Sequence, residues 1–272
     1  MRKLLFAIAI LVGTFSARAA VVDTVWVESP TMKQSYRCVV IVPSDNEKEQ
    51  ARFPVTYLLH GYSGWYANWI LRVPSLQQYA DQFRMIIVCP EGKNNWYLDS
   101  PLNDSIRWET YVGKEIPAYI DAHYPTLVQR SARAITGLSM GGHGGLYVGL
   151  RNASTFGACG SMSGGVDLRP FRKNWELNRL LGDSVQFPQH WEDYSVINLI
   201  DQYPKDTLAM IIDCGVDDFF FPVNEALHKK LVAKKIPHDY ISRPGKHDWK
   251  YWTNAIEYQL LFFHRYFSMQ KR

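Results

Sequence analysis

Apolar residues along the chain gather in short runs, and the stretches between these runs carry apolar positions at helical spacing. The first two runs alternate polar and apolar residues, which predicts strands at an antiparallel edge of a sheet. Later runs, such as Val55–Leu59, are continuously apolar, which is typical of strands buried on both faces. The predicted strands are Val21–Glu28, Tyr36–Val42, Val55–His60, Met85–Pro90, Ala132–Gly137, Ala158–Met162, Leu208–Cys214 and His238–Ser242.

Helical patterns alternate with these strands, and this order predicts an α/β fold with a mostly parallel sheet covered on both faces. No repeat or Pro/Gly-rich linker divides the 272 residues, so we expect one domain over residues 20–272. Residues 163–207 lack a simple period and are rich in aromatic residues and Pro. We expect them to form a lid-like insertion over the carboxyl ends of the strands, where open α/β sheets bind ligands. The predicted helices are Val73–Phe83, Ile106–His123, Gly141–Arg151, Asn224–Lys234 and Trp252–Phe267.

The first 19 residues differ from the rest of the chain. Arg2 and Lys3 form a basic start, an apolar run follows, and Ala17–Ala19 supplies the small residues of an A-x-A cleavage site. This pattern is typical of a secretory signal peptide, and the apolar run is short for a membrane span. We therefore predict residues 1–19 to be a signal peptide and the protein to be exported, to the periplasm or outside the cell.

The net charge and the spacing of the cysteines argue against some classes of binding partner and against a zinc site. Removing the three basic residues of the signal lowers the formal net charge from +4 to +1, so the mature chain has no electrostatic reason to bind nucleic acid or an anionic membrane. The sequence leaves its oligomeric state open. The four cysteines lie in predicted strands, Cys214 at the end of one, so buried thiols are expected, and no spacing matches a zinc site.

The strongest chemical signal is Gly137-Leu138-Ser139-Met140-Gly141, a G-x-S-x-G sequence between a predicted strand and a predicted helix. A turn this sharp holds the serine in a strained geometry with its hydroxyl exposed above the sheet, and side chains at Gly137 or Gly141 would clash. Ser139 is therefore the candidate nucleophile of an α/β-hydrolase fold.

An oxyanion hole is expected beside Ser139. In this fold a backbone N–H from the loop after an early strand joins the N–H of the residue that follows the nucleophile. The loop is His60-Gly61-Tyr62, so the predicted donors are the backbone N–H groups of Tyr62 and Met140.

The remaining catalytic candidates follow the last strands. Asp217 and Asp218 both come after an apolar strand, where the fold carries the acid that orients the catalytic histidine. Among the eight histidines, His247 alone combines a loop after the last predicted strand with the chain order Ser, Asp, His. Position alone leaves both Asp217 and Asp218 open.

Together, these motifs resemble the esterase D-like serine hydrolases, and within that group the bacterial feruloyl and acetyl-xylan esterases. The resemblance rests on the Ser139 motif, the His60-Gly61 loop, Cys214-Gly215-x-x-Asp218-Phe219 and Pro244-Gly245-x-His247-x-Trp249, and it spans most of the mature chain. It implies that Asp218 is the triad acid. A mechanism through Ser139, Asp218 and His247 needs no metal or organic cofactor. The group also contains S-formylglutathione hydrolases, whose cytosolic substrate does not suit an exported protein.

The expected function is hydrolysis of carboxylic esters, feruloyl or acetyl, on plant cell-wall polysaccharide. Trp65, Trp96, Tyr97 and Trp249 adjoin the proposed loops, and their rings suit phenolic acyl groups or sugars, so they are the predicted substrate-binding residues. Two alternatives remain: a sugar acyltransferase that uses the same triad, and a non-catalytic carbohydrate-binding protein on a hydrolase scaffold.

Overall fold

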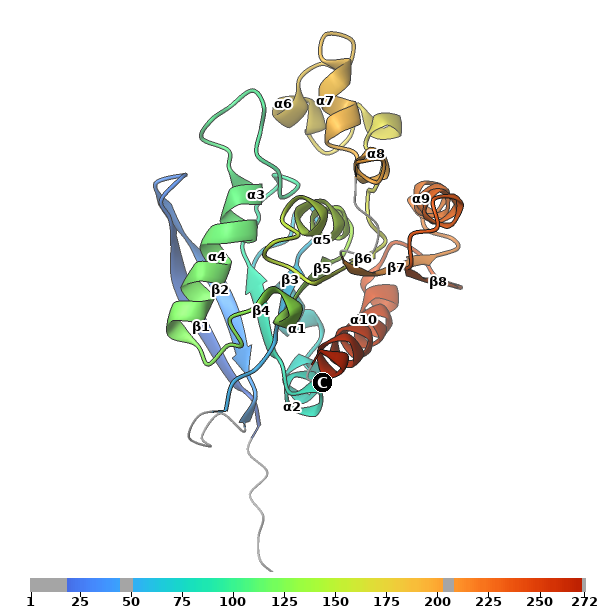
Figure 1. The fold of residues 1–272 in the computed structure, drawn as a ribbon. Helices are drawn as coiled ribbons and strands as arrows, with labels where there is room; N and C mark the ends of the chain where they lie inside the picture. The colour runs from blue at the N-terminus through green and yellow to red at the C-terminus, as the bar shows by residue number, and fades with distance from the viewer. Residues whose placement is uncertain (1–18, 45–50, 203–207, 271–272) are drawn as a thin grey trace, which may run out of the picture.

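The computed structural model describes residues 19–44, 51–202 and 208–270, and their strands form one sheet of eight (Figure 1). The strand order across the sheet is β1-β2-β4-β3-β5-β6-β7-β8. Each predicted strand is present, with ends that differ by at most two residues. The strands are β1 (Val21–Ser29), β2 (Gln34–Val42), β3 (Val55–Leu59), β4 (Ile86–Pro90), β5 (Arg133–Gly137), β6 (Ala158–Met162), β7 (Ala209–Gly215) and β8 (Asp239–Arg243).

Strand direction follows the hydrophobic pattern. β1 pairs antiparallel with β2, and β2 pairs antiparallel with β4, as the alternation of their residues predicts. From β4 to β8 the neighbouring strands are parallel, and β3, β4, β5 and β6 are buried along their whole length. The fold is therefore the predicted α/β-hydrolase type, with the parallel strands ending at one edge.

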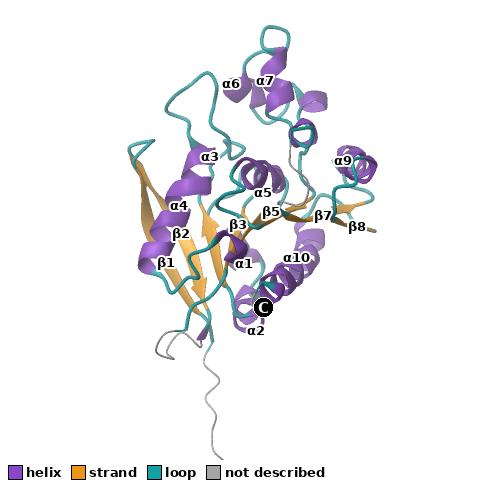
Figure 2. Ribbon diagram, viewed as in Figure 1, coloured by secondary structure: helices purple, strands orange, loops and turns teal. Residues whose placement is uncertain are grey.

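Helices cover both faces of the sheet, and two hydrophobic cores lie between them and the strands (Figure 2). One face packs against α4, α5 and α9, and the other packs against α1, α2 and α10. The helices are α1 (Asn68–Arg72), α2 (Leu76–Phe83), α3 (Trp108–Thr110), α4 (Ile116–His123), α5 (Met140–Arg151), α6 (Leu177–Leu181), α7 (Pro188–Asp193), α8 (Val196–Leu199), α9 (Phe221–Ala233) and α10 (Trp249–Met269). A π-helical turn, Tyr111–Glu115, joins α3 to α4, and short 3₁₀ turns lie at Arg130–Ala132 and Arg169–Phe171.

Two of the helix ends that differ from the sequence prediction have a clear local cause. α2 begins at Leu76 rather than Val73, because Pro74 separates it from the short helix α1. α10 begins at Trp249 rather than Trp252, because the Asp248 side chain caps it by accepting a hydrogen bond of 2.9 Å from Tyr251 N.

The insertion between β6 and β7 is described as far as residue 202 and holds α6, α7 and α8, which lie at the top of the view in Figure 1. Arg169 stabilises it through ion pairs with Asp167 at 2.8 Å and Glu192 at 2.7 Å. His143 of α5 links it to the rest of the molecule, because its Nε2 lies 2.9 Å from Tyr194 O.

The predicted signal peptide covers residues 1–19, and residues 1–18 lie outside the described part of the chain. In the described part, no helix is long and apolar enough to span a membrane. The four cysteines are all buried free thiols, as expected.

Candidate active site

Ser139 occupies the turn between β5 and α5 with a positive φ of 56° and a ψ of −116°, a conformation that is strained for a residue with a side chain. The glycines of the motif are required by the packing around it. A Cβ atom on Gly137 would lie 2.6 Å from Gly141 O, and one on Gly141 would lie 2.5 Å from Leu59 O. The backbone of Ser139 is held on both sides, since its N–H donates to Met162 O and its C=O accepts from His143 N.

The structure brings together Ser139, His247 and one of the two candidate acids, Asp218. His247 Nε2 lies 2.9 Å from Ser139 Oγ, and His247 Nδ1 lies 2.8 Å from one Asp218 oxygen and 3.0 Å from the other. Because a carboxylate only accepts hydrogen bonds, Nδ1 carries the proton and Nε2 faces the serine as a proton acceptor. This arrangement can deprotonate the Ser139 hydroxyl as it attacks a carbonyl carbon.

The two adjacent carboxylates occupy different environments. The Asp218 side chain is fully buried and also accepts a hydrogen bond of 2.8 Å from Phe220 N. Asp217 is exposed, and its backbone N–H donates to Gly245 O, which ties the acid loop to the histidine loop. The contact geometry therefore selects Asp218, as the family resemblance implied.

Tyr62 and Met140 both present unengaged backbone N–H groups, since within the described chain neither donates a hydrogen bond to another residue. Gly61 brings the Tyr62 loop close to the nucleophile: a Cβ atom there would lie 3.5 Å from Ser139 Cβ. These N–H groups are therefore placed to stabilise an oxyanion, whereas burial and the nearby Glu176 carboxylate raise the pKa of the Tyr62 phenol and keep it protonated.

His60 orients the peptide group that carries the Tyr62 N–H. Gly61 O accepts hydrogen bonds from His60 Nδ1 at 2.8 Å and from Gly64 N at 3.0 Å. The C=O and N–H groups of a trans peptide point in opposite directions. Because both hydrogen bonds hold the Gly61 C=O, the Tyr62 N–H points away from the side on which His60 Nδ1 and Gly64 N lie. The His60 Nε2 accepts from Gly92 N at 2.9 Å, so the ring is fixed at both nitrogens.

A cavity of about 440 Å³ opens over Ser139 and His247. Five aromatic side chains besides His247 contribute to its wall, together with Arg72, Leu138 and small or polar loop residues. Phe219 lies 4.2 Å and Trp252 4.9 Å from the His247 ring, measured between ring centroids, so the histidine is held between aromatic side chains. The lining residues are Gly61, Tyr62, Ser63, Gly64, Asn68, Arg72, Leu138, Ser139, Trp175, Phe219, His247, Trp249 and Trp252.

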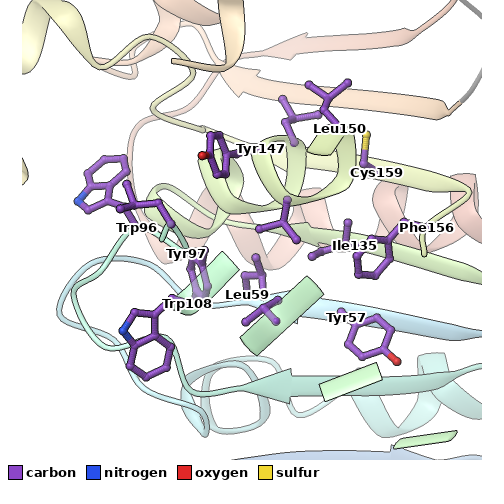
Figure 3. Close-up of a cluster of buried hydrophobic side chains, with 14 of the residues drawn as sticks. Tyr57, Leu59, Trp96, Tyr97, Trp108, Ile135, Tyr147, Leu150, Phe156 and Cys159 are labelled. Atoms are coloured by element: carbon purple, nitrogen blue, oxygen red, sulfur yellow. The ribbon is translucent and has the colours of Figure 1, made fainter. Parts of the chain in front are cut away.

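The four predicted substrate-binding residues separate into three groups. Trp249 lines the cavity, and Trp65 is 43% exposed on the loop beside it. Trp96 and Tyr97 do not line it: both are buried with at most 1% of their surface exposed, among the core side chains of Figure 3. Their prediction was wrong because the loop after β4 turns them inward, where the Tyr97 hydroxyl donates to His60 O.

Three aromatic residues that line the cavity, Trp175, Phe219 and Trp252, were not predicted as substrate-binding residues. Trp175 comes from the insertion, where no periodic pattern marked it. Phe219 directly follows the triad acid, and its place in the Asp218-Phe219 motif is the signal that could have found it. Among the described residues, no three His, Cys, Asp or Glu side chains cluster as metal ligands.

The known proteins that resemble this chain in sequence and structure include esterases and S-formylglutathione hydrolases. The chain is 26% identical to an acetyl esterase of Caldicellulosiruptor saccharolyticus, over 84% of this chain and 92% of the relative. It is also 26% identical to an S-formylglutathione hydrolase of Rattus norvegicus, over 70% and 75% of the two chains. A solved ferulic acid esterase superposes with a TM-score of 0.77 at 26% identity, covering 91% of this chain and 99% of its own.

A family model matches nearly the whole of the described chain and agrees with the fold and with these relatives. The chain belongs to the Esterase family, whose model matches residues 29–263, and it is a serine esterase that hydrolyses carboxylic esters.

Proposed function

We propose that this protein is an exported esterase that removes feruloyl or acetyl groups from plant cell-wall polysaccharide through a Ser139-His247-Asp218 triad. The observation that carries the mechanism is the position of His247, whose two nitrogens lie 2.9 Å from Ser139 Oγ and 2.8 Å from Asp218. The substrate class is supported by the aromatic cavity walls and by the names of two similar proteins, a ferulic acid esterase and an acetyl esterase.

Catalysis proceeds in two half-reactions. In the first, His247 Nε2 takes the proton of Ser139 Oγ as the oxygen adds to the ester carbonyl, and the N–H groups of Tyr62 and Met140 stabilise the oxyanion. The tetrahedral intermediate collapses as His247 gives the proton to the departing alkoxide, which leaves an acyl-Ser139. In the second, His247 deprotonates water, the hydroxide attacks the acyl carbon, and His247 returns the proton to Ser139 Oγ as the acid leaves.

Aromatic rings surround the place where the acyl group would lie. Trp249 and Trp252 pack edge to face at 5.5 Å, and Trp175 and Phe219 stack at 5.8 Å, all four lining the cavity with Ser139. Planar phenolic acids fit between such rings, and a small acetyl group needs no more than part of the space.

Export is supported by the contact made at the predicted cleavage site. Ala20, the first residue after the A-x-A sequence, is buried, and its backbone nitrogen lies 2.9 Å from Asp81 Oδ2. Cleavage after Ala19 would convert this nitrogen to an ammonium group that faces a carboxylate, so the processed end would gain an ion pair.

The test is a hydrolysis panel of methyl ferulate, acetylated xylan, 4-nitrophenyl acetate and S-formylglutathione. We expect kcat/KM to be highest on methyl ferulate or on acetylated xylan. Turnover of S-formylglutathione that exceeds that of all three oxygen esters would refute the proposed substrate class. Intact mass of the secreted or periplasmic protein tests the processing site, with a chain that starts at Ala20 expected.

A further inference from the structure

A row of side chains, three of them exposed and one half-buried, runs beside the catalytic cavity without forming part of its wall. It consists of Trp26, Arg37, Tyr66 and Trp65, which we call the aromatic strip. Trp26 is 59% exposed and Trp65 is 43% exposed, unusually high values for the largest apolar side chain. Neither ring is used by the triad, the oxyanion hole or the described core clusters.

The members of the strip hold one another in place. Trp26 of β1 and Arg37 of β2 are cross-strand partners, and the Arg37 guanidinium lies 5.0 Å from the Trp26 ring. The same guanidinium donates a hydrogen bond of 2.9 Å to the Tyr66 hydroxyl, and the Tyr66 and Trp65 rings meet edge to face at 5.0 Å. The strip is thus a fixed surface rather than a set of free side chains.

Its position makes it continuous with the cavity. Arg37 O accepts a hydrogen bond from Glu91 N, directly after β4, so the strip lies at the edge of the sheet where the parallel strands end. Trp65 lies in the loop between Gly64 and Asn68, two residues that line the cavity, and its N–H donates to Asn68 Oδ1 at 2.6 Å. A ligand that extends out of the cavity past the loop between Gly64 and Asn68 would contact Trp65 first and Trp26 last.

The surroundings of the strip are polar. On the same strand faces as Trp26 and Arg37, the neighbouring exposed residues are Thr24, Glu28 and Ser35. A protein partner requires a broader apolar patch with a polar rim. A single row of rings between hydroxyl and charged groups matches a chain of sugar rings, which present apolar C–H faces and a border of hydroxyls.

We propose that the aromatic strip binds the polysaccharide chain that carries the ester, so that the enzyme acts on polymer more efficiently than on small esters. This rests on the proposed function, in that the bound polymer is the one whose ester lies at Ser139. The sugar rings stack on Trp65 and Trp26, while Arg37 fixes the spacing between these two contacts.

Single and double alanine variants of Trp26 and Trp65 test the strip, because both side chains are exposed and their removal leaves the core intact. Val128→Ala is the matched control, because Val128 is 64% exposed and lies far from the strip. The residue before it, Leu127, donates its backbone N–H to Phe53 O, just before β3 begins, so Val128 lies where the parallel strands start rather than where they end. On acetylated xylan we expect kcat/KM to fall about three- to tenfold for each ring removed. On 4-nitrophenyl acetate, Trp26→Ala and Val128→Ala should stay within about twofold of the wild type.

Binding is measured separately by electrophoresis in gels that contain soluble deacetylated arabinoxylan, so that the result does not depend on ester hydrolysis. We expect the polysaccharide to retard the wild type and Val128→Ala, and to retard the double variant much less. Absence of retardation of the wild type, or equal retardation of the double variant, would overturn the proposal. A dimer in sedimentation that Trp26→Ala dissociates would also overturn it, by assigning the strip to self-association.

Discussion

Replacing Asp218 with Asn is expected to abolish most of the esterase activity, whereas replacing the adjacent Asp217 with Asn is not. The two substitutions are chemically identical and one residue apart, so they form a matched pair. Asp218 is buried and contacts His247 Nδ1 through both oxygens, whereas Asp217 is exposed and touches neither catalytic side chain.

The size of the effect follows from the hydrogen bonds of Asp218. Its Oδ1 accepts from Phe220 N at 2.8 Å, and the side-chain amide of the Asp218→Asn variant would keep its oxygen there and turn its NH₂ group toward His247. Nδ1 would then have to accept a hydrogen bond, which moves the imidazole proton to Nε2, where it can no longer receive the Ser139 proton. In other triads this change of tautomer costs about 10⁴-fold in kcat, or about 5 kcal/mol of transition-state stabilisation.

The assay is steady-state hydrolysis of 4-nitrophenyl acetate, with thermal unfolding as the control for folding. We expect Asp218→Asn to lose about 10⁴-fold in kcat and Asp217→Asn to stay within about twofold. Equal, small losses in both variants would refute the assignment of the acid. A dead Asp217→Asn enzyme beside an active Asp218→Asn enzyme would refute the geometry of the acid loop.

Three further outcomes are expected from other contacts. Tyr62→Phe should change kcat less than about tenfold, because the oxyanion donor is the backbone N–H; a loss of about 10²–10³ would mean that the phenol itself contributes. Burial lowers the pKa of His143 to about 4. Below about pH 6.5, His143 therefore binds a proton in the unfolded chain but stays neutral in the folded one. As the pH falls from 6.5 to 4, the free energy of unfolding decreases by up to about 3 kcal/mol. Urea unfolding at pH 7 and 4.5 should show a smaller fall for His143→Gln, and an unchanged fall would contradict this. Asp81→Asn should destabilise the chain that starts at Ala20 by about 1 kcal/mol more than a chain extended before Ala20, and equal effects would exclude the terminal ion pair.

Elements of the fold and the site could be predicted from the sequence where their residue pattern was long and regular. The strands could be located because runs such as Val55–Leu59 are buried on both faces and carry an uninterrupted apolar pattern. Ser139 and His247 could be selected because a strand-turn-helix and a fixed chain order constrain them, whereas only the family resemblance separated Asp218 from Asp217. By contrast, α1, α6 and α8 are only four or five residues long, too short for a helical period to show.

Side-chain direction in loops was the part that sequence could not supply. Trp96 and Tyr97 adjoin the site in sequence but point into the core, with backbone φ angles of 55° and 57° that reverse the chain there. Trp175 is distant in sequence from every motif, yet it lines the cavity together with Ser139. Each outcome depends on tertiary contacts rather than on a local pattern.

The most direct test of the central claim is the reaction of Ser139 itself. Incubation with a slowly hydrolysed ester and mass spectrometry of the digested protein should show one added acyl group on the peptide that contains Ser139. In the same experiment, Ser139→Ala should show no acylation, and its kcat should fall on the order of 10⁶-fold. A Ser139→Ala variant that keeps a tenth of the wild-type activity, or an acyl group on another residue, would contradict the account.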